Sequence, residues 1–102
     1  MIKTLVLVPV ADNTGAPFPE SAWLAFEARL LAFGGFSVRA DVAGVWQAEG
    51  RTYRDRSREY TVSLSSWWAL PDWLAVVDWA RDHFRQLALY VEVAGIPEIR
   101  EG

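Results

Sequence analysis

Two runs in the middle of the chain alternate between apolar and polar residues. The first alternates Phe36, Val38, Ala40 and Val42 with Ser37, Arg39 and Asp41, and the second alternates Tyr60, Val62 and Leu64 with Glu59, Thr61 and Ser63. A period of two is typical of a β-strand with one buried face. The charged segment 54–58 lies between these runs. The pattern therefore predicts a β-hairpin with a long, polar tip.

Apolar residues at helical spacing lie on either side of this hairpin. Trp23, Phe26, Leu30 and Phe33 recur every three or four residues, which predicts a helix over 20–33 that ends at Gly34. Pro71 opens a second helix. The buried stripe of that helix is expected to consist of Trp73, Val77, Ala80, Phe84 and Leu87.

Two further strands complete the pattern. Residues 2–10 are apolar on both sides, as in a central strand covered on both faces. Leu89, Val91 and Val93 alternate with Tyr90 and Glu92, which predicts a last strand over 88–94. Gly95 and Pro97 are expected to end this strand, and the remaining tail is polar.

The order of these elements is β-α-β-β-α-β, and two right-handed crossovers would then place both helices on one face of the sheet. This predicts an α+β, ferredoxin-like fold, with a four-stranded antiparallel sheet and a single domain over 1–102. The first and third strands are expected to be central, and the second and fourth to be edges. One core is expected to contain Trp23, Phe26, Leu30, Phe33, Phe36, Val62, Val77, Phe84 and Val91.

Composition narrows the functional classes. The net charge is -3, which makes nucleic acid an improbable partner. The chain has no cysteine and one histidine, so neither a metal nor another cofactor is expected. The apolar run at 5–8 is too short for a membrane span and carries no signal-peptide pattern, which favours a cytoplasmic protein without membrane contact.

Four arginines near the hairpin tip leave nucleic-acid binding open as a second alternative. These are Arg51, Arg54, Arg56 and Arg58. Glu49, Asp55 and Glu59 are interleaved with them, so the local excess of positive charge is small. A solvated hairpin with surface ion pairs is the favoured interpretation.

The sheet face opposite the helices holds the candidate binding residues Arg39, Asp41, Tyr90 and Glu92. An arginine, two carboxylates and a phenol can orient a polar small molecule. A small enzyme or small-molecule binder using this open sheet face is thus one alternative. The other is that Arg39, Asp41 and Glu92 are surface ions, or ion pairs inside a dimer contact. No catalytic residue is assigned, because His83 has no serine or carboxylate placed to complete a relay.

Six tryptophans are many for a domain of this size, and not all are expected to be buried. Trp67, Trp68, Leu74 and Trp79 lie outside the predicted core stripes and form the candidate interface. Soluble proteins normally cover such apolar surface. We therefore expect an oligomeric interaction or binding module, most simply a homodimer, with another protein as a further partner. The alternative is that these tryptophans lie flat against their own domain.

Several short motifs resemble those of small bacterial and mobile-element proteins. They are Val-Pro-Val-x-Asp-Asn at 8–13, Phe-Gly-Gly-Phe-Ser at 33–37, Gly-x-Trp at 44–46 and Tyr-x-Asp-x-Ser-Arg-x-Tyr at 53–60. Together they extend over most of the chain. The resemblance implies no particular activity.

Overall fold

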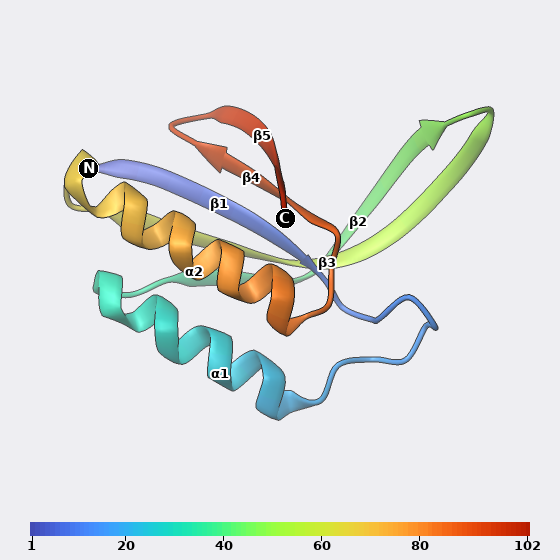
Figure 1. Ribbon diagram of the computed structural model, residues 1–102, viewed down its shortest axis with the longest axis horizontal. Coiled ribbons are helices and arrows are strands. Elements are labelled where there is room, and N and C mark those ends of the chain that lie inside the picture. Colours follow the sequence, from blue (N-terminus) through green and yellow to red (C-terminus); the bar gives the residue numbers. More distant parts are fainter.

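The computed structural model describes all residues, 1–102. Five strands, two α-helices and two short 3-10 turns follow one another: β1 (Ile2–Pro9), α1 (Glu20–Leu30), η1 (Leu31–Phe33), β2 (Ser37–Ala48), β3 (Arg51–Leu64), η2 (Trp67–Ala69), α2 (Leu70–His83), β4 (Ala88–Val93) and β5 (Ile96–Glu101). Both helices cover the same face of the sheet, and nothing covers the other face (Figure 1). The predicted α+β, ferredoxin-like arrangement is confirmed, with one strand more than expected. No helix is long and apolar enough to cross a membrane.

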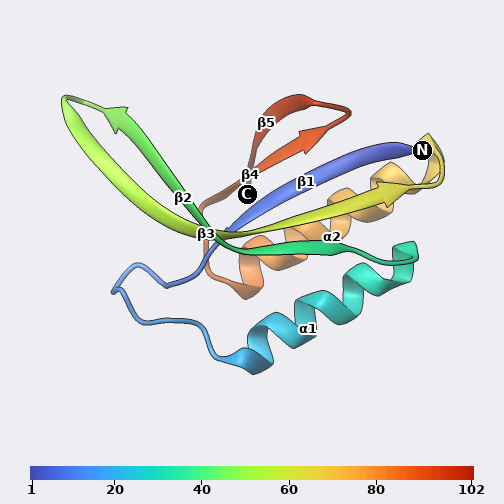
Figure 2. The same ribbon diagram turned by 180° about the vertical axis from the view of Figure 1, so that it is seen from behind.

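The sheet has the order β2-β3-β1-β4-β5, and every neighbouring pair is antiparallel. The first and third strands are interior and the second is an edge, as the sequence predicts. Gly34 ends the first helical segment with a φ of 101°, a left-handed conformation that glycine adopts without steric cost. The helices lie side by side beneath the sheet in both views (Figure 2).

The core lies between the sheet and the helices. It consists of Ile2, Val6, Val8, Trp23, Phe26, Leu30, Tyr60, Val62, Leu64, Trp73, Val77, Ala80, Phe84, Leu89 and Val91. Two residues of the predicted core, Phe33 and Phe36, are only partly buried against it. They flank Gly34 in the connection that follows α1, where the helical spacing no longer applies.

The middle hairpin differs from the prediction at its tip. The charged segment 54–58 is not a turn but part of β3, and the turn is the tight pair Glu49–Gly50 with φ values of 53° and 75°. Two successive positive φ values suit the twist of a hairpin. A bulge interrupts the alternation between Arg39 and Val42, whereas Gly44 pairs regularly with Asp55. β1 pairs with β3 only as far as Ser57, so residues 42–57, called the arm below, project beyond the sheet (Figure 1).

The C-terminal segment is also corrected by the structure. It is not a polar tail, because Ile96–Glu101 forms β5 and covers β4, which is therefore not an edge. Ala94 and Gly95 make the turn, and Pro97 is tolerated because β5 is itself an edge strand. Leu87 does not join the helical stripe: it is 90% exposed, because α2 ends at His83 and Arg85 has a positive φ.

The first strand is covered on one face only, although its sequence is apolar on both. Ile2, Thr4, Val6 and Val8 are buried beneath the helices. Leu5 and Leu7 point to the opposite face and are half-buried. The expectation of a strand covered on both faces is therefore wrong for the single chain.

Candidate functional site

The face of the sheet that the helices leave uncovered, called the open face below, is crossed by one row of side chains. Residues paired directly across neighbouring strands share a face. The register gives the row Arg39, Glu59, Leu7, Tyr90 and Ile99, one residue from each strand. The two charged residues of this row, Arg39 and Glu59, thus lie on β2 and β3, and Leu7, the Tyr90 ring and Ile99 continue the row from β1 to β5.

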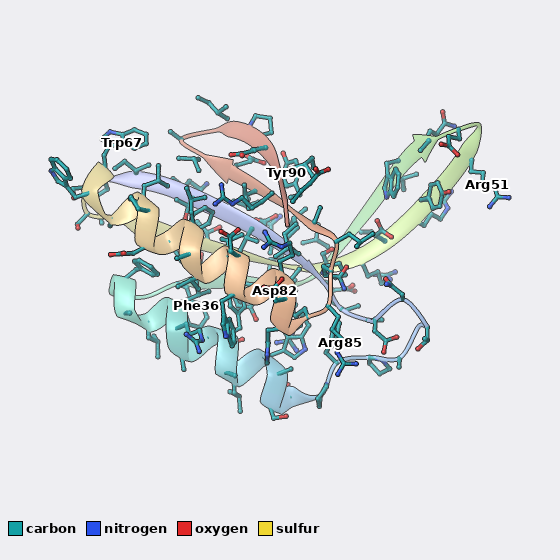
Figure 3. The ribbon with its side chains drawn as sticks, in the orientation of Figure 1. Phe36, Arg51, Trp67, Asp82, Arg85 and Tyr90 are labelled. Carbon is teal, nitrogen blue, oxygen red and sulfur yellow. The ribbon has the colours of Figure 1, made fainter.

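A groove of about 390 Å³ lies where the arm leaves the sheet. Its lining comes from β1, the arm, β4 and β5, and consists of Leu7, Pro9, Trp46, Asp55, Ser57, Ala88, Leu89, Tyr90 and Ile99. The volume lies within the range of small-molecule sites. Tyr90 lies on β4 at the end of the sheet from which the arm departs (Figure 3).

The arm side of the groove is aromatic. The Trp46 indole stacks on the Tyr53 ring, with ring centroids 4.4 Å apart and planes 16° from parallel. The Trp46 Nε1–H donates a hydrogen bond of 2.7 Å to the Asp55 carboxylate. This bond fixes the indole and leaves Asp55 as a fixed negative charge beside it. Both aromatic rings keep an exposed surface.

The β4 side of the groove carries a phenol paired with a carboxylate. The Tyr90 hydroxyl donates to Glu92 Oε2 over 2.8 Å. This hydrogen bond, together with partial burial and the negative charge of Glu92, raises the pKa of Tyr90 above its ordinary value. The phenol therefore stays protonated with its hydrogen donated to Glu92, and the pair presents the phenol oxygen as an acceptor and a negative charge to the open face.

The four candidate binding residues are only partly brought together. Tyr90 and Glu92 are adjacent, as the period of two predicts. Arg39 lies on the same face but three strands away, which is roughly 14 Å at normal strand spacing. Asp41 lies at the bulge and pairs instead with Arg56, at 2.7 Å. The structure thus places the compact part of the site at Tyr90 and Glu92.

The four arginines of the hairpin do not form one basic surface. Arg56 pairs with Asp41, and Arg58 lies within 3.7 Å of both Glu20 and Glu27 and stacks over Trp23. Arg51 and Arg54 make no ion pair within the chain. Arg51 is at the tip of the arm (Figure 3).

The candidate interface residues are separated by the fold. Trp67 and Trp68 lie in η2, at the end of the molecule opposite the arm, and Trp68 is 91% exposed (Figure 3). Leu74 and Trp79 pack partly against the core of their own chain. Arg29 covers the Trp79 ring at 3.9 Å, and His83 stacks on the same ring. His83 Nε2 is also 3.1 Å from the Ala22 carbonyl oxygen, so this histidine joins the two helices.

Trp46, Tyr53 and Asp55 were not among the sequence-based candidates, although Trp46 and Asp55 line the groove and Tyr53 stacks on Trp46. Residues 53, 55 and 57 share one face of a strand, but the sequence there shows no alternation of apolar and polar residues that would reveal it. The charged residues between them suggested a turn instead. The chemistry assembled here is an apolar floor, an aromatic wall and two carboxylates. No group of three or more His, Asp or Glu side chains is clustered in a way that could hold a metal ion.

Comparison with known proteins identifies the fold. No family model and no curated protein matches the chain. Among solved structures, a phage SAM lyase in its apo state matches with a TM-score of 0.68 and 16% identity, over 99% of this chain and 89% of that one. The same lyase in complex with S-methyl-5′-thioadenosine matches with a TM-score of 0.67 and 13% identity, over the same shares. The divalent cation tolerance protein CutA1 of Thermus thermophilus matches with a TM-score of 0.57 and 14% identity, over 97% and 80%. At these identities the likeness shows the fold alone.

Proposed function

We propose that this chain is a self-associating, small-molecule-binding module and that the groove at the base of the arm is its ligand site. The observation that carries the proposal is the groove itself. It joins an apolar floor, the fixed Trp46 indole and the Tyr90 phenol in one concave site, and Glu92 accepts the hydrogen bond of that phenol. Small-molecule sites combine an apolar lining with a few convergent polar groups in this way.

Self-association is supported by the surface area of the single chain. A compact monomer of 11.5 kDa exposes about 5,800 Å² by the usual scaling of area with mass. This chain exposes 6571 Å². The excess of roughly 770 Å² is comparable to the area that one partner loses in an interface of standard size. The projecting arm accounts for it, because every arm residue except three is exposed.

The chemical class of the ligand follows from the groove and from the structural likeness. A flat ring can stack on the exposed Trp46 face, and a positive charge is attracted by that face and by the carboxylates of Asp55 and Glu92. S-adenosylmethionine carries both an adenine ring and a sulfonium charge. The likeness to a SAM lyase over 99% of the chain supports a ligand of this kind. We therefore propose an S-adenosyl compound or its thioadenosine fragment.

Calorimetric titration tests the ligand proposal directly. S-adenosylmethionine and S-methyl-5′-thioadenosine are each titrated into the wild-type chain, with an expected dissociation constant below about 100 µM for at least one. Trp46→Ala should weaken binding about tenfold or more, because it removes the stacking surface. Trp68→Ala is the matched control, since this indole is exposed at the opposite end, and should leave the affinity unchanged. Absence of binding to wild type at about 1 mM ligand would refute the ligand class.

Cleavage of S-adenosylmethionine is a second candidate function, favoured by the same likeness to a lyase. Incubation followed by chromatography would then show loss of S-adenosylmethionine and appearance of thioadenosine products. Glu92→Gln should abolish this turnover, because it removes the carboxylate beside Tyr90. Binding without turnover in the wild type would leave the chain as a binder and exclude the lyase.

A further inference from the structure

We propose that the chain associates by inserting the β5 corner of one copy into a hollow on the arm of another. The proposal rests on the self-association proposed above and assigns the contact. The arm hollow measures about 370 Å³ and lies on the face of the arm opposite the groove. Its lining consists of Ala43, Gly44, Val45, Arg54, Asp55 and Arg56, and Asp55 is the one residue that it shares with the groove. The corner consists of Ile96 and Glu98, which share one face of β5.

The two surfaces match in polarity. Val45 forms the apolar part of the hollow and is 59% exposed, and Ile96 is a protruding side chain that is 70% exposed. Arg54 lies beside Val45 by register and has no carboxylate partner within its own chain. Glu98 lies two residues from Ile96 and has no ion-pair partner either. An apolar knob with an adjacent acid thus meets an apolar hollow with an adjacent arginine.

The backbone also favours this pairing. β2 and β5 are the two edges of the sheet, so each has unpaired N–H and C=O groups along its outer side. The arm and the β4–β5 turn point in opposite directions in both views (Figures 1 and 2). One chain therefore cannot satisfy both surfaces by itself. When each of two chains inserts its β5 corner into the arm hollow of the other, both hollows and both corners are covered. The result is a closed, two-fold dimer.

The contact leaves the ligand groove free. Trp46 and Ser57 point to one face of the arm, and Val45 and Arg54 point to the other, whereas Asp55 borders both the groove and the hollow. Substitutions at the contact should therefore alter association without altering ligand affinity. Ligand binding in the groove and association through the arm hollow can therefore be tested separately.

Mixing of single variants tests the contact by sedimentation equilibrium. Val45→Asp should prevent association through the arm, and Ile96→Asp should prevent it through the corner. Both positions are exposed, so each variant is expected to stay folded. Each alone should be monomeric, at 11.5 kDa. An equimolar mixture should contain heterodimers. The Ile96→Asp chain keeps an intact arm, which can receive the intact corner of the Val45→Asp chain.

A charge exchange supplies the second readout. Arg54→Glu and Glu98→Arg should each weaken the dimer about tenfold, and the double variant should recover most of the loss. Lys3→Glu is the matched control, because this exposed residue lies on the open face away from the arm. If the Val45→Asp variant still dimerises, or if Trp68→Glu dissociates the dimer, the arm-to-corner contact is wrong although the chain does self-associate. A monomeric wild type would overturn both.

Discussion

At the residue scale, the interior is organised by aromatic side chains. Phe26 contacts Tyr60 and Phe84 edge-to-face, at 5.0 and 5.9 Å between ring centroids. The Tyr60 hydroxyl reaches out of this cluster and donates to Glu27 over 2.7 Å. Burial raises the pKa of Tyr60, and the hydrogen bond to Glu27 raises it further, so this phenol is neutral in the folded protein. The polar atom of Tyr60 is thereby satisfied.

Replacing Phe26 by alanine is expected to cost about 3–5 kcal/mol, the usual range for a buried aromatic residue. Phe26 is fully buried, so the substitution leaves a cavity that the neighbouring rings cannot fill. Leu24→Ala is the matched control on the same helix, because Leu24 is exposed, and should change stability by less than about 0.5 kcal/mol. Urea melts measure both. Similar losses for the two variants would show that Phe26 is not a core residue.

At the element scale, strands and helices with regular periodicity were predictable, and β5 was not. Trp23, Phe26 and Leu30 mark α1, and the alternation of Tyr60, Val62 and Leu64 marks the part of β3 that contacts the core. The β5 sequence has no such alternation, and Pro97 suggested an end. Its strand conformation depends instead on pairing with β4 and on a contact with α2 that is distant in sequence.

The candidate site followed the same rule. Tyr90 and Glu92 could be found because they alternate within a regular strand. Trp46 and Asp55 were missed because the arm buries almost nothing, and a strand without a buried face shows no hydrophobic period. Asp41 was misplaced because the bulge after Arg39 changes which residues face the site. Bulges leave no clear signal in a single sequence.

The contact between α2 and β5 can be tested at Asp78. Its carboxylate accepts two hydrogen bonds from Arg100 and one from Arg81, at 2.8–3.0 Å. The hydrogen bonds from Arg100 are the largest cause of the lowered pKa of Asp78, and the bond from Arg81 lowers this pKa further. Asp78→Asn is expected to cost about 1–2 kcal/mol near pH 7, because the pairs are partly exposed to water. In the Asp78→Asn variant, hydrogen exchange should accelerate more for the β5 amides than for the β1 amides, relative to wild type.

The pH dependence of this contact has a definite sign. A carboxylate whose pKa is lowered by folding stabilises the folded state above its unfolded pKa of about 3.9, and the effect is lost as the pH falls through the lowered value. The difference between wild type and Asp78→Asn in urea melts should therefore shrink as the pH falls below about 4 and through the lowered pKa of Asp78. Asp82→Asn is the control, because this exposed carboxylate is 3.6 Å from Arg81 and should have little effect at any pH. A pH-independent difference would contradict the assignment.

At the scale of the whole molecule, the chain consists of a packed body and an arm that contributes nothing to the core. The Cα radius of gyration is 13.5 Å, compared with about 12.8 Å for a compact domain of this length. The longest extent, 40 Å, includes the arm. The body alone thus has the complete ferredoxin-like core, and the arm supplies one wall of the proposed ligand groove and the proposed contact surface.

The last prediction separates these two parts. Replacing residues 43–56 by Asn-Gly joins Val42 to Ser57, a pair of the same hydrogen-bonding type as Ala48 and Arg51 at the native turn. The only backbone hydrogen bond from this segment to the body is that from the Val10 N–H to the Arg56 carbonyl, 3.1 Å long. Its loss should cost about 1 kcal/mol, which lowers the melting temperature by about 4–8 °C.

The shortened chain should therefore fold but behave as a monomer that no longer binds the adenosyl ligand. Circular dichroism, sedimentation equilibrium and calorimetry measure these three properties on one preparation. A native spectrum, a monomer mass and the absence of ligand binding would together locate both functions in the arm. If the shortened chain still dimerises, the contact must lie on the body instead, and the exposed indoles of Trp67 and Trp68 become the surface to test. If the shortened chain fails to fold, the arm is part of the cooperative folding unit. The arm would then stabilise the fold although it contributes no residue to the core.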